Sequence, residues 1–142
     1  MAVTAHVYGQ APVKMLNKEI DYDTDTIKVM LCTSAYTPAQ ATHAYKSSVT
    51  NEVTGTGYTA GGATLASKTI SSTSEVTTLD AADVTWSSST ITARYAVVYD
   101  STGTDSTSAL ICYVDFGADV VSSGGNFVIT WDAAGIVTIT AS

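Results

Sequence analysis

The residues that could carry chemistry are few, and the first group is an alternating run of carboxylates, Asp21, Asp23 and Asp25. The D-x-D-x-D spacing matches the start of a calcium-binding loop, in which alternate side chains give oxygen ligands to a hard cation. The match then fails, because Cys32 stands at the twelfth position, where a calcium loop has a bidentate Glu. We interpret the run as a solvated lead-in to the first strand. A weak cation site on one face of an extended segment is the alternative.

The two histidines do not form a recognisable catalytic group. His6 lies in the N-terminal segment and His43 in a polar loop, and neither has a Cys or a carboxylate at a spacing typical of catalysis. The sequence contains no G-x-S-x-G, P-loop or H-E-x-x-H motif. We therefore predict a protein that is not an enzyme, with no catalytic residue, no metal and no cofactor.

The glycine-rich segment 55–62 resembles a phosphate-binding loop only in its glycine content. It lacks the Lys-Ser/Thr ending, and a strand is expected after it, so no helix N-terminus would face an anion. We interpret these glycines as positions where the chain crosses between sheets with positive φ angles or close backbone contacts.

Aromatic side chains at alternating strand positions are more often part of a core than of a sugar-stacking surface. Trp86 is the main exception, because it precedes the serines at 87–89 at an expected strand end, where one face of the ring can stay exposed. We predict Trp86 and Tyr58 as candidate contacts with a ligand or partner, and core packing for the others: Tyr95, Tyr99, Tyr113 and Trp131.

Length and charge narrow the class of protein. The chain has 142 residues, which is the size of one domain, and we see no linker or repeat, so we expect a single domain over 1–142. Its 13 acidic and 6 basic residues give a formal charge of −7, which repels phosphate backbones and argues against nucleic-acid binding. No signal peptide is visible, and no apolar run approaches the ~20 residues of a membrane helix, so we expect no membrane partner.

Residue patterns favour a mainly β fold. A short N-terminal helix is expected to begin near Ala11, because Pro12 is tolerated only in a first helical turn. Short alternating runs follow, separated by Gly, Ser and Asp, and they predict an antiparallel β-sandwich or a jelly-roll-like barrel. We expect the segment 132–135 to be a hairpin loop between the last two strands. The predicted core comprises Ile27, Val29, Leu31, Ile91, Tyr95, Val97, Leu110, Val114, Phe127, Ile129, Trp131 and Ile139.

Cys32 and Cys112 each lie in an apolar run that is typical of a strand. This position favours reduced, buried cysteines that pack as small hydrophobic residues. A disulfide between them is the alternative, and the sequence alone does not separate the two.

Several segments, taken in order, resemble one family over nearly the whole chain: NKEID at 17–21, IKVMLCTS at 27–34, TGTGY at 54–58, DVTWS at 83–87, TARYAV at 92–97 and ITWDAAGI at 129–136. The chain is similar to a family of small structural proteins of tailed bacteriophages and prophages, of the head-decoration, neck or tail-accessory type. The resemblance carries no catalytic motif and transfers no active-site residue.

The resemblance implies a virion structural protein, most simply a capsid decoration protein on the particle exterior, made in the host cytoplasm. Its partners would be the major capsid protein or other virion proteins and further copies of itself. We expect a homo-oligomer, with a trimer preferred, because linked weak contacts gain from effective concentration. We expect the helix near 11–19 to serve as a docking arm or a subunit contact. The alternative is a tail- or fibre-associated module that recognises host-surface carbohydrate through an exposed aromatic ring.

Overall fold

The computed structural model describes residues 2–142, and most of its regular structure is β-strand. In chain order the elements are β1 (Thr4–Val7), α1 (Ala11–Leu16), β2 (Ile27–Cys32), the short 3-10 turn η1 (Lys46–Ser48), β3 (Ala63–Thr64), β4 (Thr69–Thr73), β5 (Val76–Asp80), β6 (Val84–Asp100), β7 (Leu110–Ile129) and β8 (Val137–Thr140). The predicted short helix is confirmed, and it begins at Ala11 with Pro12 in its first turn.

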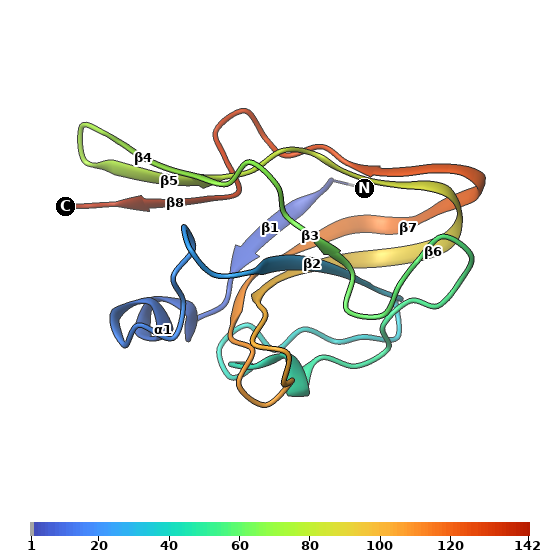
Figure 1. Cartoon of the computed structure of the whole chain (residues 1–142), viewed down its shortest axis with the longest axis horizontal. Helices are drawn as coiled ribbons and strands as arrows, with labels where there is room; N and C mark the ends of the chain where they lie inside the picture. Colours follow the sequence, from blue (N-terminus) through green and yellow to red (C-terminus); the bar gives the residue numbers. More distant parts are fainter. Residues whose placement is uncertain (1) are drawn as a thin grey trace.

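Two antiparallel sheets form the fold (Figure 1). The larger has the strand order β1-β7-β6-β2-β3, and the smaller has the order β4-β5-β8. The arrangement is an open β-sandwich and not a closed barrel, so the first of the two predicted architectures is confirmed. In Figure 1 the smaller sheet projects from one end of the molecule, with the C-terminus at its tip.

A single long hairpin of β6 and β7 builds much of the sandwich. Its ladder is irregular between Trp86 and Thr90 and again between Ala93 and Tyr95. Bulges of this kind bend a strand and increase its twist. Figure 1 shows the result: the hairpin runs along the upper layer, turns sharply, and returns in the lower layer beside β2. The sequence pattern predicts short separate strands at 83–86 and 90–99 in place of β6, and near 110–116 and 126–131 in place of β7.

The main hydrophobic core lies between the two layers. It joins Leu79 and Val137 of the smaller sheet to Ile27, Val29 and Val98 of the larger one. A second cluster, which includes Met30, Val97 and Tyr99, lies on the opposite face of the larger sheet. Tyr8, Tyr36 and Val49, from segments outside the long strands, cover it. The middle of the larger sheet is therefore buried on both faces.

Most predicted core residues are buried, as expected: Ile27, Val29, Leu31, Ile91, Val97, Leu110, Phe127 and Ile129. Tyr95, Val114 and Trp131 are only half-buried, and Ile139 is 46% exposed, so the prediction is wrong for these four. Ile139 belongs to β8 of the projecting sheet, where little of the body covers it.

The alternation in the sequence predicts that one face of a strand at 90–99 carries Ile91, Ala93, Tyr95, Val97 and Tyr99, and this prediction is also wrong. Ile91 and Ala93 pack in the main core, whereas Val97 and Tyr99 pack in the second cluster. The bulge between Ala93 and Tyr95 adds one residue, and a shift of one residue moves side chains to the other face of the sheet.

Two topological details also differ from expectation. The segment 132–135 does form a turn, with the Gly135 N–H donating to the Asp132 carbonyl at 2.8 Å, but it does not close a hairpin. β8 pairs with β5 instead of with β7, so the turn carries the chain from one sheet to the other. The N-terminal strand β1, which pairs with β7, had not been predicted.

Candidate functional site

The two predicted contact residues lie next to each other: Trp86 is buried in the main core, and the half-buried Tyr58 packs against that core. Their ring centroids are 6.0 Å apart, and Trp86 also meets Phe127 edge-on at 5.9 Å. Trp86 is only 6% exposed. The prediction of an exposed Trp86 ring is wrong, because the bend that follows it in β6 places the ring between the two layers.

Tyr58 is held by hydrogen bonds within the protein. Its hydroxyl donates to Glu52 Oε1 at 2.7 Å and accepts from the Leu31 N–H at 3.0 Å. Burial raises the pKa of this hydroxyl above its ordinary value. Glu52, which the sequence analysis did not single out, also accepts from the Gly61 N–H at 2.6 Å. Tyr58 and Glu52 therefore fasten the glycine-rich crossing to β2.

Each of the two histidines contacts a tyrosine. His6 stacks on Tyr113 with ring centroids 5.0 Å apart, and His43 Nδ1 lies 3.1 Å from the Tyr36 hydroxyl. Tyr36 also shares a hydrogen bond of 2.9 Å with the buried hydroxyl of Tyr8. These contacts connect the segment that contains His43 to the second hydrophobic cluster.

The alternating carboxylates do not converge on a common point in the described residues. Asp21 Oδ1 accepts from the Thr24 N–H at 3.2 Å, and Asp25 Oδ2 accepts from the Asp21 N–H at 3.0 Å, so both side chains stabilise their own turn. The hydrogen bonds from Thr24 lower the pKa of Asp21. Within residues 2–142 no three His, Cys, Asp or Glu side chains are placed to hold a metal ion.

One carboxyl group in this region is unusual. Asp100, the last residue of β6, is 2% exposed, and its Oδ2 atom is buried with no hydrogen-bond partner among the described residues. Burial, followed by a hydrogen bond and charge repulsion from Asp25, raises the pKa of Asp100 to about 7. No signal in the sequence identified Asp100, because it is brought against Ile27 only through the pairing of β2 with β6.

The most exposed apolar side chains include four that belong to one end of the molecule. Leu16 and Val13 of α1 are 85% and 46% exposed, and Ile70 of β4 and Ile139 of β8 are 49% and 46% exposed. Figure 1 shows α1 and the projecting sheet at the same end. We call this surface, defined by Val13, Leu16, Ile70 and Ile139, the open end.

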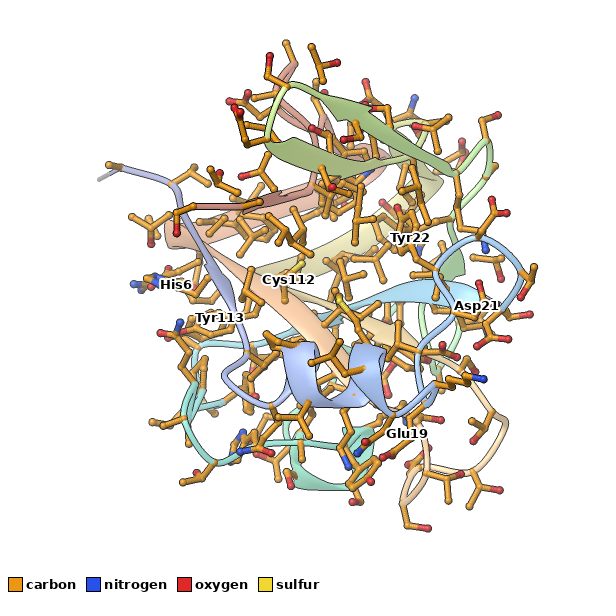
Figure 2. The ribbon with its side chains drawn as sticks, turned by 90° about the vertical axis from the view of Figure 1, so that its left-hand side faces the viewer. His6, Glu19, Asp21, Tyr22, Cys112 and Tyr113 are labelled. Carbon is orange, nitrogen blue, oxygen red and sulfur yellow. The ribbon has the colours of Figure 1, made fainter. Side chains whose placement is uncertain are left out.

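A groove of about 720 Å³ lies between the α1–β2 connection and the projecting sheet. Apolar side chains line both walls, with Met15 and Ile20 on one and Ile70 and Leu79 on the other. Figure 2 looks onto this end of the molecule, with Tyr22 and Asp21 in the segment between α1 and the sheet above it. The open end therefore combines exposed apolar side chains with a hollow that they adjoin.

Polar contacts fix α1 in place. The Lys14 ammonium forms an ion pair with Glu19 at 3.1 Å and donates to the Tyr45 hydroxyl, which in turn donates to Glu19 Oε2 at 2.7 Å. The bond from Tyr45 and then those from Lys14 lower the pKa of Glu19. Leu16 is thus presented on a helix that is tied to a distant segment of the chain.

A second apolar cleft, of about 480 Å³, lies between β1 and the end of β7. Val3 and Phe116 line it on one side, and Trp131 and Ile136 on the other. The Trp131 indole N–H donates to the Ala82 carbonyl at 3.0 Å, which holds this half-buried ring at the edge of the cleft.

No helix within residues 2–142 has the length and apolar character needed to cross a membrane. Comparison of the whole chain with known protein families, with curated proteins and with solved structures finds no match in any of the three.

Proposed function

We propose that this protein is a non-enzymatic structural component of a tailed-phage particle, bound to the outside of the capsid through its open end. The observation that carries the proposal is Leu16, a leucine that is 85% exposed on a helix held in place by Lys14, Glu19 and Tyr45. A fixed, exposed apolar group is costly in water and is typical of a surface that binds a partner.

The rest of the surface suits the exterior of a particle. Every residue of β4 is exposed, and apart from Ile70 they are all Ser or Thr. The net charge of −7 keeps such a surface away from packaged nucleic acid. The partners would be the major capsid protein or another virion protein, together with further copies of this chain.

Recognition of host carbohydrate by a tail or fibre module is less well supported. That function needs an aromatic face open to a sugar ring. The two aromatic residues on which it depended, Trp86 and Tyr58, pack against each other, and Trp86 is buried in the core.

Mass spectrometry of purified phage particles from the host that encodes this chain tests the proposed location. We expect the protein in intact particles at a fixed ratio to the major capsid protein. It should remain on empty heads that have lost their tails. Absence from intact particles would refute the proposal, and presence on tails alone would refute the capsid location.

Binding of the purified protein to particles that lack it tests the role of the open end. We expect Leu16→Lys to weaken binding about tenfold or more, because burying a leucine side chain is worth about 1.5–3 kcal/mol. Val121→Lys is the matched control, since Val121 is 65% exposed but lies on β7 outside the open end. Equal affinities of the two variants would show that the open end is not the docking surface.

A further inference from the structure

The outer side of β4 is an unpaired strand edge. β4 is the last strand of the smaller sheet, and within residues 2–142 no other strand pairs with its outer side. Every residue of β4 is exposed. Figure 1 shows the tip of the β4–β5 hairpin projecting beyond the larger sheet. The backbone of β4 is therefore open to a strand from another molecule.

Hydrogen bonds between β5 and β8 fix the direction of the backbone groups in the smaller sheet. The Leu79 carbonyl accepts from the Ile136 N–H at 2.8 Å. The Glu75 carbonyl accepts from the Ala141 N–H at 2.7 Å. The odd-numbered residues of this strand therefore bond to the β8 side. Because bonding alternates along an antiparallel strand, the even-numbered residues of β5 bond to β4.

Two residues of β4 consequently direct their backbone groups away from the sheet. The even-numbered residues of β5 are paired with Thr69, Ser71 and Thr73. Ile70 and Ser72 alternate with these three and turn their N–H and C=O groups to the open edge. The edge thus offers two donors and two acceptors that the smaller sheet does not use.

β4 has none of the features that usually keep an edge strand from pairing with another chain. Protected edges carry Lys or Pro, contain a bulge, or are very short. The β4 sequence TISST has neither a charge nor a proline, and its ladder with β5 is regular. It is also longer than the other edge strands, β1, β3 and β8. This combination is typical of an edge that accepts a strand from another molecule.

We propose that β4 pairs with β4 of a second copy of this chain, antiparallel, about a two-fold axis at Ser71. In this register Ile70 lies opposite Ser72 of the second copy, and the two residues exchange backbone hydrogen bonds through the groups that face the edge. The contact is repeated on the other side of the axis, because a two-fold interface uses the same residues twice. Two three-stranded sheets then form one sheet across both copies.

The charges that flank β4 favour a second copy as the partner. Lys68 and Glu75 are the only charged residues in the segment 68–79, and they lie at opposite ends of β4. The proposed register places Lys68 of each copy opposite Ser74 and beside Glu75 of the other. The Lys68 ammonium donates to the Asp25 carbonyl and keeps two further donors for this contact. Parallel pairing in register would instead bring like charges together.

An apolar contact adds to the backbone pairing. Ile70 is half exposed and shares a face of the sheet with Leu79, its partner in β5. In the proposed register the Ile70 side chains of the two copies are diagonal neighbours on that face, within reach of each other. A two-fold contact joins two copies only, so it is separate from the contacts that build a trimer. The inference does not depend on the proposed function.

Disulfide formation between copies tests the register. Opposed residues at non-hydrogen-bonded positions have Cα atoms about 4.5 Å apart, which a disulfide can span. With diamide as the oxidant, we expect Ser71→Cys to give a linked dimer on non-reducing gels about tenfold faster or more than Thr69→Cys. The two copies of residue 69 would be about 13 Å apart, although both positions are exposed on the same face of β4. Cys32 and Cys112 are buried and provide little background. Equal rates for the two variants would overturn the proposal.

A proline at the edge tests the backbone hydrogen bonds. Ser72→Pro, made in the Ser71→Cys background, removes an N–H that faces the open edge, where proline is tolerated. We expect cross-linking to slow about tenfold or more. Thr138→Pro is the matched control, because the Thr138 N–H faces the outer edge of β8, and it should keep the rate. Thermal unfolding shows whether each variant is folded. An unchanged rate in a folded Ser72→Pro variant would overturn the proposal.

A charge exchange tests the antiparallel orientation without a proline. In the Ser71→Cys background at about 50 mM salt, where screening is weak, we expect Glu75→Lys to slow cross-linking about threefold or more. Lys68→Glu combined with Glu75→Lys should restore the rate, because the two pairs form again with reversed signs. A folded double variant that cross-links as slowly as Glu75→Lys alone would refute this orientation.

Discussion

The two cysteines are buried on opposite faces of the larger sheet. Cys32 packs in the second cluster and Cys112 in the main core, so the sheet lies between the two thiols and they are not bonded to each other. Burial raises the pKa of each thiol to about 12. Because the thiolate is the reactive form, both cysteines behave as small apolar residues, which agrees with the first of the two interpretations of the sequence.

A substitution at Val97 tests whether the larger sheet is buried on both faces. The side chain is fully buried in the second cluster. We expect Val97→Asp to unfold the domain, because an unpaired buried carboxylate costs several kcal/mol against a total stability of about 5–15 kcal/mol. Circular dichroism and thermal unfolding measure the loss. Val121→Asp, at a side chain that is 65% exposed, should stay folded; a folded Val97→Asp would show that this face of the sheet is more open than described.

Gly62 is a position where the backbone leaves no room for a side chain. Its φ angle is +79°, and a Cβ atom there would lie 1.9 Å from the Val29 carbonyl oxygen. We expect Gly62→Ala to lower the free energy of unfolding by roughly 2–5 kcal/mol, from backbone strain and from displacement of β2.

Gly103→Ala separates these two causes. Gly103 has a similar φ of +85° but no neighbouring atom within 4 Å of the added Cβ. The expected cost is about 1 kcal/mol, from conformation alone. Denaturant unfolding of both variants provides the comparison, and equal losses would mean that the close contact at Gly62 relaxes freely.

At the scale of elements, the β6–β7 hairpin is shaped by its bulges. At the bulge near Tyr95, Arg94 Nε donates to Asp115 Oδ1 at 2.6 Å, and the Gly117 N–H donates to the same carboxylate at 2.8 Å. The bond from Arg94 holds the pKa of Asp115 below its usual value. At the bend, the buried Ser89 and Ser122 hydroxyl groups share a hydrogen bond of 2.8 Å. Polar side chains therefore bridge the strands where the regular ladder is interrupted.

Ser122→Ala is the corresponding test of the bend. Its hydroxyl accepts the buried Ile91 N–H at 3.2 Å and also bonds to Ser89, so the substitution leaves buried polar groups without a partner. We expect a loss of about 1–3 kcal/mol in the free energy of unfolding. Ser123→Ala, at the exposed neighbouring position, should change it by less than about 0.5 kcal/mol. Similar small losses for both variants would mean that water replaces the missing hydroxyl.

At the scale of the whole molecule, the question is how copies associate. The open end and the second cleft expose apolar surface on a chain whose formal charge is −7. Burial of apolar surface favours self-association, while like charges on the copies oppose it.

We predict a homo-oligomer, with a trimer as the preferred form. Light scattering over a range of protein concentrations measures the mass. The trimer fraction should rise between 50 mM and 300 mM salt, because screening weakens the repulsion between copies. A strict monomer under all these conditions, with no contact between copies on a particle, would contradict the prediction and weaken the proposed capsid role.

The sequence by itself determined the fold class, the start of the helix at Ala11 and most of the core, because apolar periodicity and the conformational limits of proline act locally. The tertiary structure decided which sheet face each residue of β6 occupies, since one bulge after Ala93 reverses the alternation. It also decided that Trp86 is covered, because Tyr58, from the distant glycine-rich crossing, packs against the ring in the main core. The burial of Asp100 depends on strand pairing between residues far apart in the chain, which no local pattern encodes.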